Sequence, residues 1–181
     1  MTDLIQPQTP MKRVLEVFPG AQRALFRHYH IGGCASCAFQ PDETLEALCA
    51  RNNINVTEVI RQIETSHEQD AAMEITPADL AGQIRSGSVR LVDIRSREEF
   101  EATHIEPAVL LSQPVMQDIL GHWPREGLLV LYDHRGQKSL DAAAYFIGQG
   151  FRNVRCLRGG IDAWSREVDS KIPRYRVELS S

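Results

Sequence analysis

One stretch in the second half of the chain reads Leu128-Leu129-Val130-Leu131-Tyr132-Asp133-His134-Arg135-Gly136-Gln137-Lys138-Ser139. Leu128 to Tyr132 is a nearly continuous apolar run, which is typical of a parallel strand that is covered on both faces. A polar, glycine-containing segment follows, and Leu140 to Gly150 then has helical periodicity. The stretch therefore predicts a buried strand, a tight loop and a helix, the repeating unit of an α/β fold.

The same alternation of strands and helices extends over the C-terminal part of the chain. Thr76-Pro77-Ala78-Asp79 predicts the start of a helix that runs to Ile84, and Val89 to Ile94 and Val154 to Leu157 are short apolar strand candidates. Right-handed crossovers between such strands give a mostly parallel sheet with helices on both faces. Ligands of these sheets bind beyond the carboxyl ends of the strands, where the loop that begins at Asp133 is expected to lie.

The loop after this strand is a candidate anion-binding loop. Its residues are Asp133, His134, Arg135, Gly136, Gln137, Lys138 and Ser139. Backbone N–H groups of such a loop, together with the N-terminus of the next helix, favour anions. Asp133 adds a negative charge there, which Arg135 and Lys138 are placed to offset. In the alternative that we favour over a new catalytic role, Asp133 and Ser139 simply cap the helix.

The N-terminal part predicts a small all-α bundle. Helices are expected to begin at Thr9-Pro10, Ala21, Thr44 and Asn55, with Gly32-Gly33 closing the second helix in left-handed geometry. Polar residues without apolar periodicity then indicate a linker. We predict a helical domain over residues 1–66, a linker over 67–74 and an α/β domain over 75–181.

A Cys-x-x-Cys motif is the strongest chemical signal in the N-terminal part. Cys34 and Cys37 are close enough in sequence to form a disulfide or to bind one metal ion. A metal site needs more than two ligands. Cys49 is the first further candidate, and His30 is the second. Cys49 has the phase of a core residue on its helix, and His30 lies at a helix end, so each also has a structural interpretation.

A fourth cysteine lies in the C-terminal part of the chain. Cys156 lies in a strand candidate and is interpreted as a core residue. If the Cys-x-x-Cys pair binds metal, an iron–sulfur cluster or a zinc ion is the expected cofactor.

Composition excludes several classes of protein. The chain has 181 residues, a formal net charge of −4 and 43% hydrophobic residues. It has no basic footprint for nucleic acid, no apolar run near the ~20 residues that span a bilayer, and no basic segment ahead of an apolar core at its start. We expect a cytoplasmic protein, in which four cysteines indicate redox or metal chemistry rather than structural disulfides.

Several separated motifs resemble the rhodanese family over about residues 75–170. They are the loop from Asp133 to Ser139, Gly159-Gly160-Ile161-Asp162-Ala163-Trp164, and Asp93-Ile94-Arg95 followed by Glu99-Phe100 and His104-Ile105. In active members the residue that corresponds to Asp133 is a cysteine that carries sulfur as a persulfide. The resemblance implies a rhodanese-like fold without sulfurtransferase activity. We expect Asp93, Arg95 and His104 to be structural.

A second resemblance covers about residues 9–64. The helix before His28-Tyr29-His30, the Cys34/Cys37 pair and the helix from Thr44 are similar to a small helical Cys-x-x-Cys domain described as hybrid-cluster-associated, a disulfide oxidoreductase or iron–sulfur-related module. In that family the two cysteines are the functional pair.

Two hypotheses follow from the sequence. In the first, Cys34 and Cys37 perform thiol redox or sulfur chemistry, and the inactive rhodanese-like domain binds a thiol or sulfur-carrier protein or a small anionic sulfur compound. In the second, the chain is a non-catalytic metal-binding or iron–sulfur regulatory adaptor. An active thiosulfate sulfurtransferase is a third and less favoured interpretation, because a carboxylate cannot attack sulfur. Nucleic acid and membrane are not expected partners.

Overall fold

The computed structural model describes residues 5–32 and 39–174. The chain divides into two compact units, residues 1–72 and 73–181. Within the described residues, no helix combines the length and the apolar character needed to cross a membrane.

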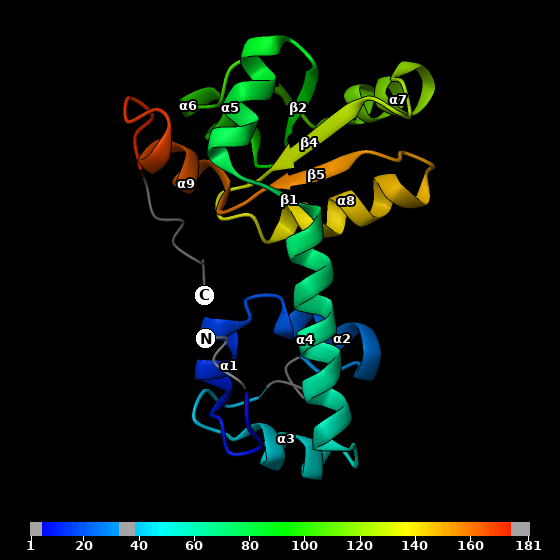
Figure 1. Cartoon of the computed structure of the whole chain (residues 1–181), viewed down its shortest axis with the longest axis vertical. Helices are drawn as coiled ribbons and strands as arrows, with labels where there is room; N and C mark the ends of the chain where they lie inside the picture. Colours follow the sequence, from blue (N-terminus) through cyan, green and yellow to red (C-terminus); the bar gives the residue numbers. More distant parts are fainter. Residues whose placement is uncertain (1–4, 33–38, 175–181) are drawn as a thin grey trace. The chain divides into compact units, whose positions relative to one another are not determined.

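The first unit is helical (Figure 1). Its helices are α1 (Met11–Val17), α2 (Ala21–Tyr29), α3 (Leu45–Arg51) and α4 (Val56–Met73). Their apolar faces share one core, whose fully buried members include Met11, Val14, Leu25, Leu45, Leu48, Val59 and Ile63.

Two predicted helix starts in this unit are confirmed by their caps. The Thr44 hydroxyl accepts a hydrogen bond from the Ala47 N–H at 3.2 Å. The Asn55 side chain accepts from the Thr57 N–H at 2.9 Å ahead of α4. Both contacts satisfy N–H groups that the first turn of a helix leaves without an intrahelical partner.

The end of α2 differs from the prediction. His30, rather than Gly32-Gly33, is the residue that ends the helix, with a left-handed φ of 56°, and its N–H donates to the carbonyls of the preceding turn. Gly32 follows with φ 90°. A histidine in this conformation is uncommon, which is why the sequence favoured the glycines.

The segment predicted as a linker, residues 67–74, has regular secondary structure. Residues 67–73 are the last turns of α4, and Glu74–Ile75 forms strand β1. The segment lacks apolar periodicity because most of it is exposed, but its Glu, Gln, Ala and Met residues are good helix formers. The Asp70 carboxylate binds the Arg23 guanidinium of α2, which joins these turns to the helical unit.

The second unit is a parallel sheet covered on both faces, as predicted. Its strands are β1 (Glu74–Ile75), β2 (Val89–Asp93), β3 (Val109–Leu110), β4 (Leu128–Tyr132) and β5 (Val154–Leu157), in the order β1-β5-β4-β2-β3. Its helices are α5 (Pro77–Ser86), α6 (Arg97–Ala102), α7 (Gln113–His122), α8 (Lys138–Gly148) and α9 (Gly160–Glu167).

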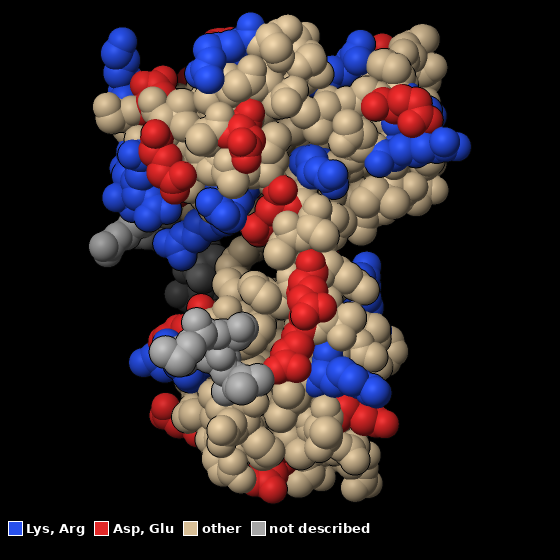
Figure 2. All heavy atoms as spheres, in the orientation of Figure 1, with Lys and Arg blue, Asp and Glu red and all other residues tan. Residues whose placement is uncertain are grey.

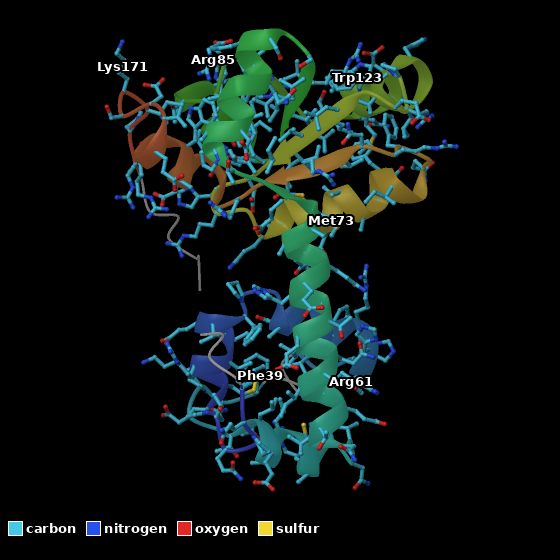
Figure 3. All side chains as sticks on the ribbon, viewed as in Figure 1. Phe39, Arg61, Met73, Arg85, Trp123 and Lys171 are labelled. Atoms are coloured by element: carbon cyan, nitrogen blue, oxygen red, sulfur yellow. The ribbon has the colours of Figure 1, made fainter. Side chains whose placement is uncertain are left out.

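Alternate residues of the central strand β4 belong to two different cores. Val130 and Tyr132 pack with residues of α5 and α9, whereas Leu129 and Leu131 pack with residues of α7 and α8. Met73, labelled in Figure 3, packs at the edge of the second of these cores. The continuous apolar run of β4 is thus explained by helices on both faces.

Candidate functional site

The loop after β4 closes on the side chain of its own first residue. Asp133 is 5% exposed, and its Oδ1 accepts hydrogen bonds from the Gly136 N–H at 2.5 Å and the Ser139 hydroxyl at 3.3 Å. Its Oδ2 accepts from the Lys138 N–H at 2.9 Å and the Gln137 N–H at 3.3 Å. The donors that make such a loop an anion site therefore converge on a carboxylate that belongs to the chain.

The start of α9 holds the same loop from its other side. The Ile161 and Asp162 N–H groups donate to the carbonyl oxygens of Asp133 and His134 at 3.0 and 3.2 Å. Gly160 permits this approach: a Cβ built on it lies 2.4 Å from the Asp133 carbonyl oxygen, and its φ of 60° is left-handed. The motif around Gly159-Gly160 is thus part of the loop's support.

Gly136 allows a second close approach. A Cβ at this position lies 2.8 Å from the Leu157 carbonyl oxygen and 2.9 Å from the Gly159 nitrogen, and its φ is 82°. The β4–α8 loop and the β5–α9 loop are therefore in direct backbone contact, which fixes the shape of both.

A buried ion pair lies at the end of the neighbouring strand β2. Arg95 donates to Asp93 through Nε at 2.9 Å and Nη2 at 2.5 Å, and through Nη2 to the Thr103 carbonyl oxygen at 2.8 Å. The Tyr132 hydroxyl accepts a hydrogen bond from the Ile105 N–H at 3.2 Å. Burial, and then the charge of Asp93, raise the pKa of Tyr132, so its hydroxyl stays neutral.

This network confirms the structural roles predicted for Asp93 and Arg95. It joins the ends of β2 and β4 to the segment that contains Thr103 and Ile105. His104 is also structural: its ring nitrogens lie 2.9 Å from the Phe100 carbonyl oxygen and 3.0 Å from Glu106 Oε1, and it stacks on Phe100.

Basic side chains surround the closed loop. Arg135 and Lys138 are exposed on the β4–α8 loop and the first turn of α8, and Arg158 is exposed on the β5–α9 loop. Figure 2 shows Lys and Arg side chains gathered around α9 and the loops beside it. A hydrogen bond from Arg174, and then the charges of Arg174 and Arg166, lower the pKa of Asp162, which therefore stays ionised and paired.

The predicted cysteine site lies outside the described residues, since neither Cys34 nor Cys37 belongs to them. Their described neighbours are Gly32 and Phe39, and the ring of Phe39 is 3.5 Å from a Cβ built on Gly32. Among the described residues, no group of three or more His, Cys, Asp or Glu side chains is arranged to hold a metal ion.

The additional ligand candidates have other environments. Cys49 is 1% exposed in the helical core, and burial raises the pKa of its thiol to about 11, which disfavours the thiolate that a metal needs. His30 is exposed, with its ring 6.1 Å from that of Phe26. Cys156 is fully buried on the α8 side of the sheet, as the core interpretation predicted.

The sequence did not reveal three features of this site. They are the four donors that share the Asp133 carboxylate, the backbone contact between Gly136 and the β5–α9 loop, and the Tyr132 hydroxyl that holds the Ile105 N–H. The glycine pair at 159–160 was a usable signal for the second feature. The others depend on side chains that meet only in the folded sheet.

The fold and the loop define a class: a parallel α/β domain with a helix-capping loop at the carboxyl end of its central strand. Residues 76–167, slightly more than half of the chain, match the rhodanese-like domain family. The chain belongs to the rhodanese-like domain family.

Two relatives show what the match covers. The chain is 34% identical over 88 residues to the thiosulfate sulfurtransferase GlpE of Pseudomonas syringae, which is 49% of this chain and 83% of that protein. It is 30% identical over 115 residues to the adenylyltransferase and sulfurtransferase UBA4 of Candida albicans, but this spans only 26% of that protein and 59% of this chain.

Solved structures also match part of the chain. The BH2092 protein of Bacillus halodurans is 27% identical with a TM-score of 0.48, over 62% of this chain and 82% of that one. The human single-domain sulfurtransferase TSTD1 is 24% identical with a TM-score of 0.47, over 52% of this chain and 96% of that one.

Proposed function

We propose that the protein handles thiols or sulfur through Cys34 and Cys37, and that its rhodanese-like domain binds a partner without turning over thiosulfate. The observation that carries the second part is the Asp133 carboxylate, which takes the Gly136, Gln137 and Lys138 N–H groups and the Ser139 hydroxyl. The names of the relatives as sulfurtransferases support sulfur chemistry in a broad sense.

The chemistry of sulfur transfer supports the loss of activity. A sulfurtransferase thiolate attacks the outer sulfur of thiosulfate, a new S–S bond forms, and sulfite leaves with the electron pair of the broken bond. By the resemblance to active rhodanese domains, Asp133 occupies the position of that thiolate. A carboxylate forms no persulfide, and its charge opposes an approaching anion.

The donors of the loop support the same proposal. Buried N–H groups and hydroxyls are strong anion ligands only when no other acceptor holds them. Here a covalently attached carboxylate with four contacts satisfies them. Thiosulfate would have to displace Asp133 and leave its charge buried, which is unfavourable.

The Cys-x-x-Cys pair supplies the chemistry that the loop lacks. One thiolate of the pair attacks the disulfide of a partner, a mixed disulfide forms, and the second cysteine displaces the partner as a dithiol. Two electrons pass to the partner, and Cys34 and Cys37 end as a disulfide. With a partner persulfide, the thiolate attacks the outer sulfur, a new S–S bond forms, and the partner leaves as a thiolate with the electron pair of the broken S–S bond.

The first experiment separates the two domains by their chemistry. We expect no thiosulfate:cyanide turnover by the wild-type protein, and reversible oxidation of two thiols that is lost in Cys34→Ser and in Cys37→Ser but retained in Asp133→Ala. Turnover by the wild-type protein, or full thiol cycling in both cysteine variants, would contradict the proposal.

A second measurement tests the metal-binding hypothesis. The protein is purified without oxygen, and its metal content and ultraviolet-visible spectrum are recorded. If the protein contains stoichiometric zinc or iron and Cys34→Ser loses it, the pair binds metal. The regulatory adaptor would then be the supported function in place of redox or sulfur handling.

A further inference from the structure

We propose that the loops at the carboxyl ends of β4 and β5 form a docking surface for an acidic segment of a partner protein. We define the basic rim as Arg135, Lys138 and Arg158. The inference deepens the proposed function, on which it rests, by naming the chemistry of the partner that the rhodanese-like domain would bind.

The three cations of the basic rim lie on two loops that touch. Gly136 is packed against the backbone at Leu157 and Gly159. Arg135 precedes Gly136 in the sequence and Arg158 lies between Leu157 and Gly159, so the two arginines come from adjoining segments. Lys138 begins α8, and its N–H is held by Asp133. All three side chains are exposed. The backbone that carries the three cations is therefore held in place by contacts between the two loops.

Nearby acidic groups are already neutralised in part. The Asp133 carboxylate is buried and turned into its loop. Asp162, in the first turn of α9, binds both Arg174 at 2.8 Å and Arg166 at 3.7 Å. Two arginines thus face one carboxylate in the first turn of α9, while Asp141, in the first turn of α8, is an exposed acidic group on the same helix end as Lys138.

The loop itself cannot serve as the ligand site, because Asp133 takes its inward-facing donors. A ligand therefore meets exposed side chains, among them those of the basic rim, and each exposed cation contributes about 0.2–1 kcal/mol to an ion pair. Such small terms favour a partner that uses several cations together, rather than a single small anion. Contributions of this size are typical of protein–protein interfaces with complementary charges, in which charge determines the specificity and the rate of association.

The sign of the neighbouring charge selects among large polyanions. The acidic helix α6, with Glu98 and Glu101 exposed, follows β2 at the same edge of the sheet. The whole chain also carries a formal net charge of −4. A long nucleic acid or an anionic membrane would meet this repulsion, whereas a short acidic protein segment can contact the basic rim alone.

The experiment uses the full-length protein and a fluorescent ten-residue oligo-glutamate peptide as the probe. Binding is measured by anisotropy at low and at moderate salt. We expect the double variant Arg135→Glu/Arg158→Glu to bind at least tenfold more weakly, with a smaller salt dependence. Arg85→Glu, the reversal of an exposed arginine in the last turn of α5, is the charge-matched control for the single variants Arg135→Glu and Arg158→Glu, and should stay within twofold of wild type.

Three outcomes would overturn the inference. They are equal losses in the control and in the double variant, tighter binding of a ten-residue oligothymidylate than of the peptide, and displacement of the peptide by millimolar thiosulfate. Peptide binding is also measured in Cys34→Ser, where it should be unchanged. If the wild-type protein cycles its thiols normally but does not bind the peptide, only the docking surface is refuted. If it binds the peptide but does not cycle its thiols, only the proposed thiol chemistry is refuted.

Discussion

At the scale of single residues, Asp133 shows how one side chain changes what a loop can bind. Its carboxylate accepts from three backbone N–H groups and from one hydroxyl, and it is almost fully buried. The same contacts that exclude a small anion also keep the loop folded. Loss of the carboxylate should therefore appear in stability as well as in ligand binding.

We predict that Asp133→Ala destabilises the rhodanese-like unit by about 2–4 kcal/mol, because it leaves several buried donors without their acceptor. The measurement is urea unfolding followed by tryptophan fluorescence, since Trp123 and Trp164 both lie in this unit. Glu167→Ala, at the exposed end of α9, is the control. A loss below about 0.5 kcal/mol, the range of ordinary surface substitutions, would show that the loop does not depend on this carboxylate.

Cys49 gives a prediction for alkaline pH. Its pKa is raised by burial to about 11, above the roughly 8.5 of an exposed cysteine. The neutral, buried Cys49 thiol therefore contributes its full share to the free energy of unfolding below about pH 8.5, the pKa of a cysteine in the unfolded chain. This contribution is lost as the pH rises towards the pKa of Cys49 in the folded protein. In a Cys34→Ser/Cys37→Ser background, Cys49→Ala should lose less stability between pH 8 and pH 10.5 than its parent does. Far-UV circular dichroism in urea measures this, and equal losses would refute it.

At the scale of elements, the sequence predicted the central strands and several helix N-caps, but not the N-cap of α1 and the end of α2, which lie at Pro10 and His30 rather than at Thr9 and Gly32-Gly33. β4, the Thr44 and Asn55 caps and the helix after Thr76 agree with the structure. Strong apolar runs and short-range capping patterns explain this success, because both act locally.

Other elements could not be predicted because their signals are weak or non-local. β1 and β3 have two residues each and exist only because longer strands pair with them. α6 has no buried residue, and α7 has only Ile119. The last turns of α4 are polar, and a contact distant in sequence, between Asp70 and Arg23, accompanies their helical structure.

The Asp70 contact can be tested directly. Its carboxylate binds Arg23 in a partly buried setting, with side chains 13% and 20% exposed. We predict that Asp70→Ala destabilises the helical unit by about 1–2 kcal/mol, more than a fully exposed ion pair contributes. Glu68→Ala, on an exposed position of the same helix, should change stability by less than about 0.5 kcal/mol. Equal effects of the two substitutions in far-UV circular dichroism would contradict the anchoring role.

At the scale of the whole molecule, the two units have separate cores. Leu48 belongs to the core of the first unit, and Phe146 to a core of the second. Separate cores predict that each unit unfolds as its own cooperative transition. The exact domain boundaries remain a prediction, because α4 runs to Met73, across the division between the units.

Two optical probes separate these transitions. Leu48→Ala, which should cost about 2–5 kcal/mol, is expected to lower the midpoint of the helical transition in far-UV circular dichroism and to leave the tryptophan fluorescence midpoint unchanged. Phe146→Ala should lower the tryptophan fluorescence midpoint, because both tryptophans lie in the second unit, and should leave the unfolding of α1 to α4 unchanged. A shift of the tryptophan fluorescence midpoint by Leu48→Ala would show that the units unfold together.

The self-occupied loop has a consequence for how the domain responds to its surroundings. The anion in the loop is the Asp133 carboxylate, which is covalently attached to the backbone. Its local effective concentration is therefore independent of the concentrations of free sulfate, phosphate or thiosulfate. A carboxylate is also inert to the peroxides that oxidise a reactive thiolate stepwise to sulfinic and sulfonic acids. The conformation of the loop therefore depends neither on a bound free anion nor on the oxidation state of a thiol, and a partner meets the same loop in either case.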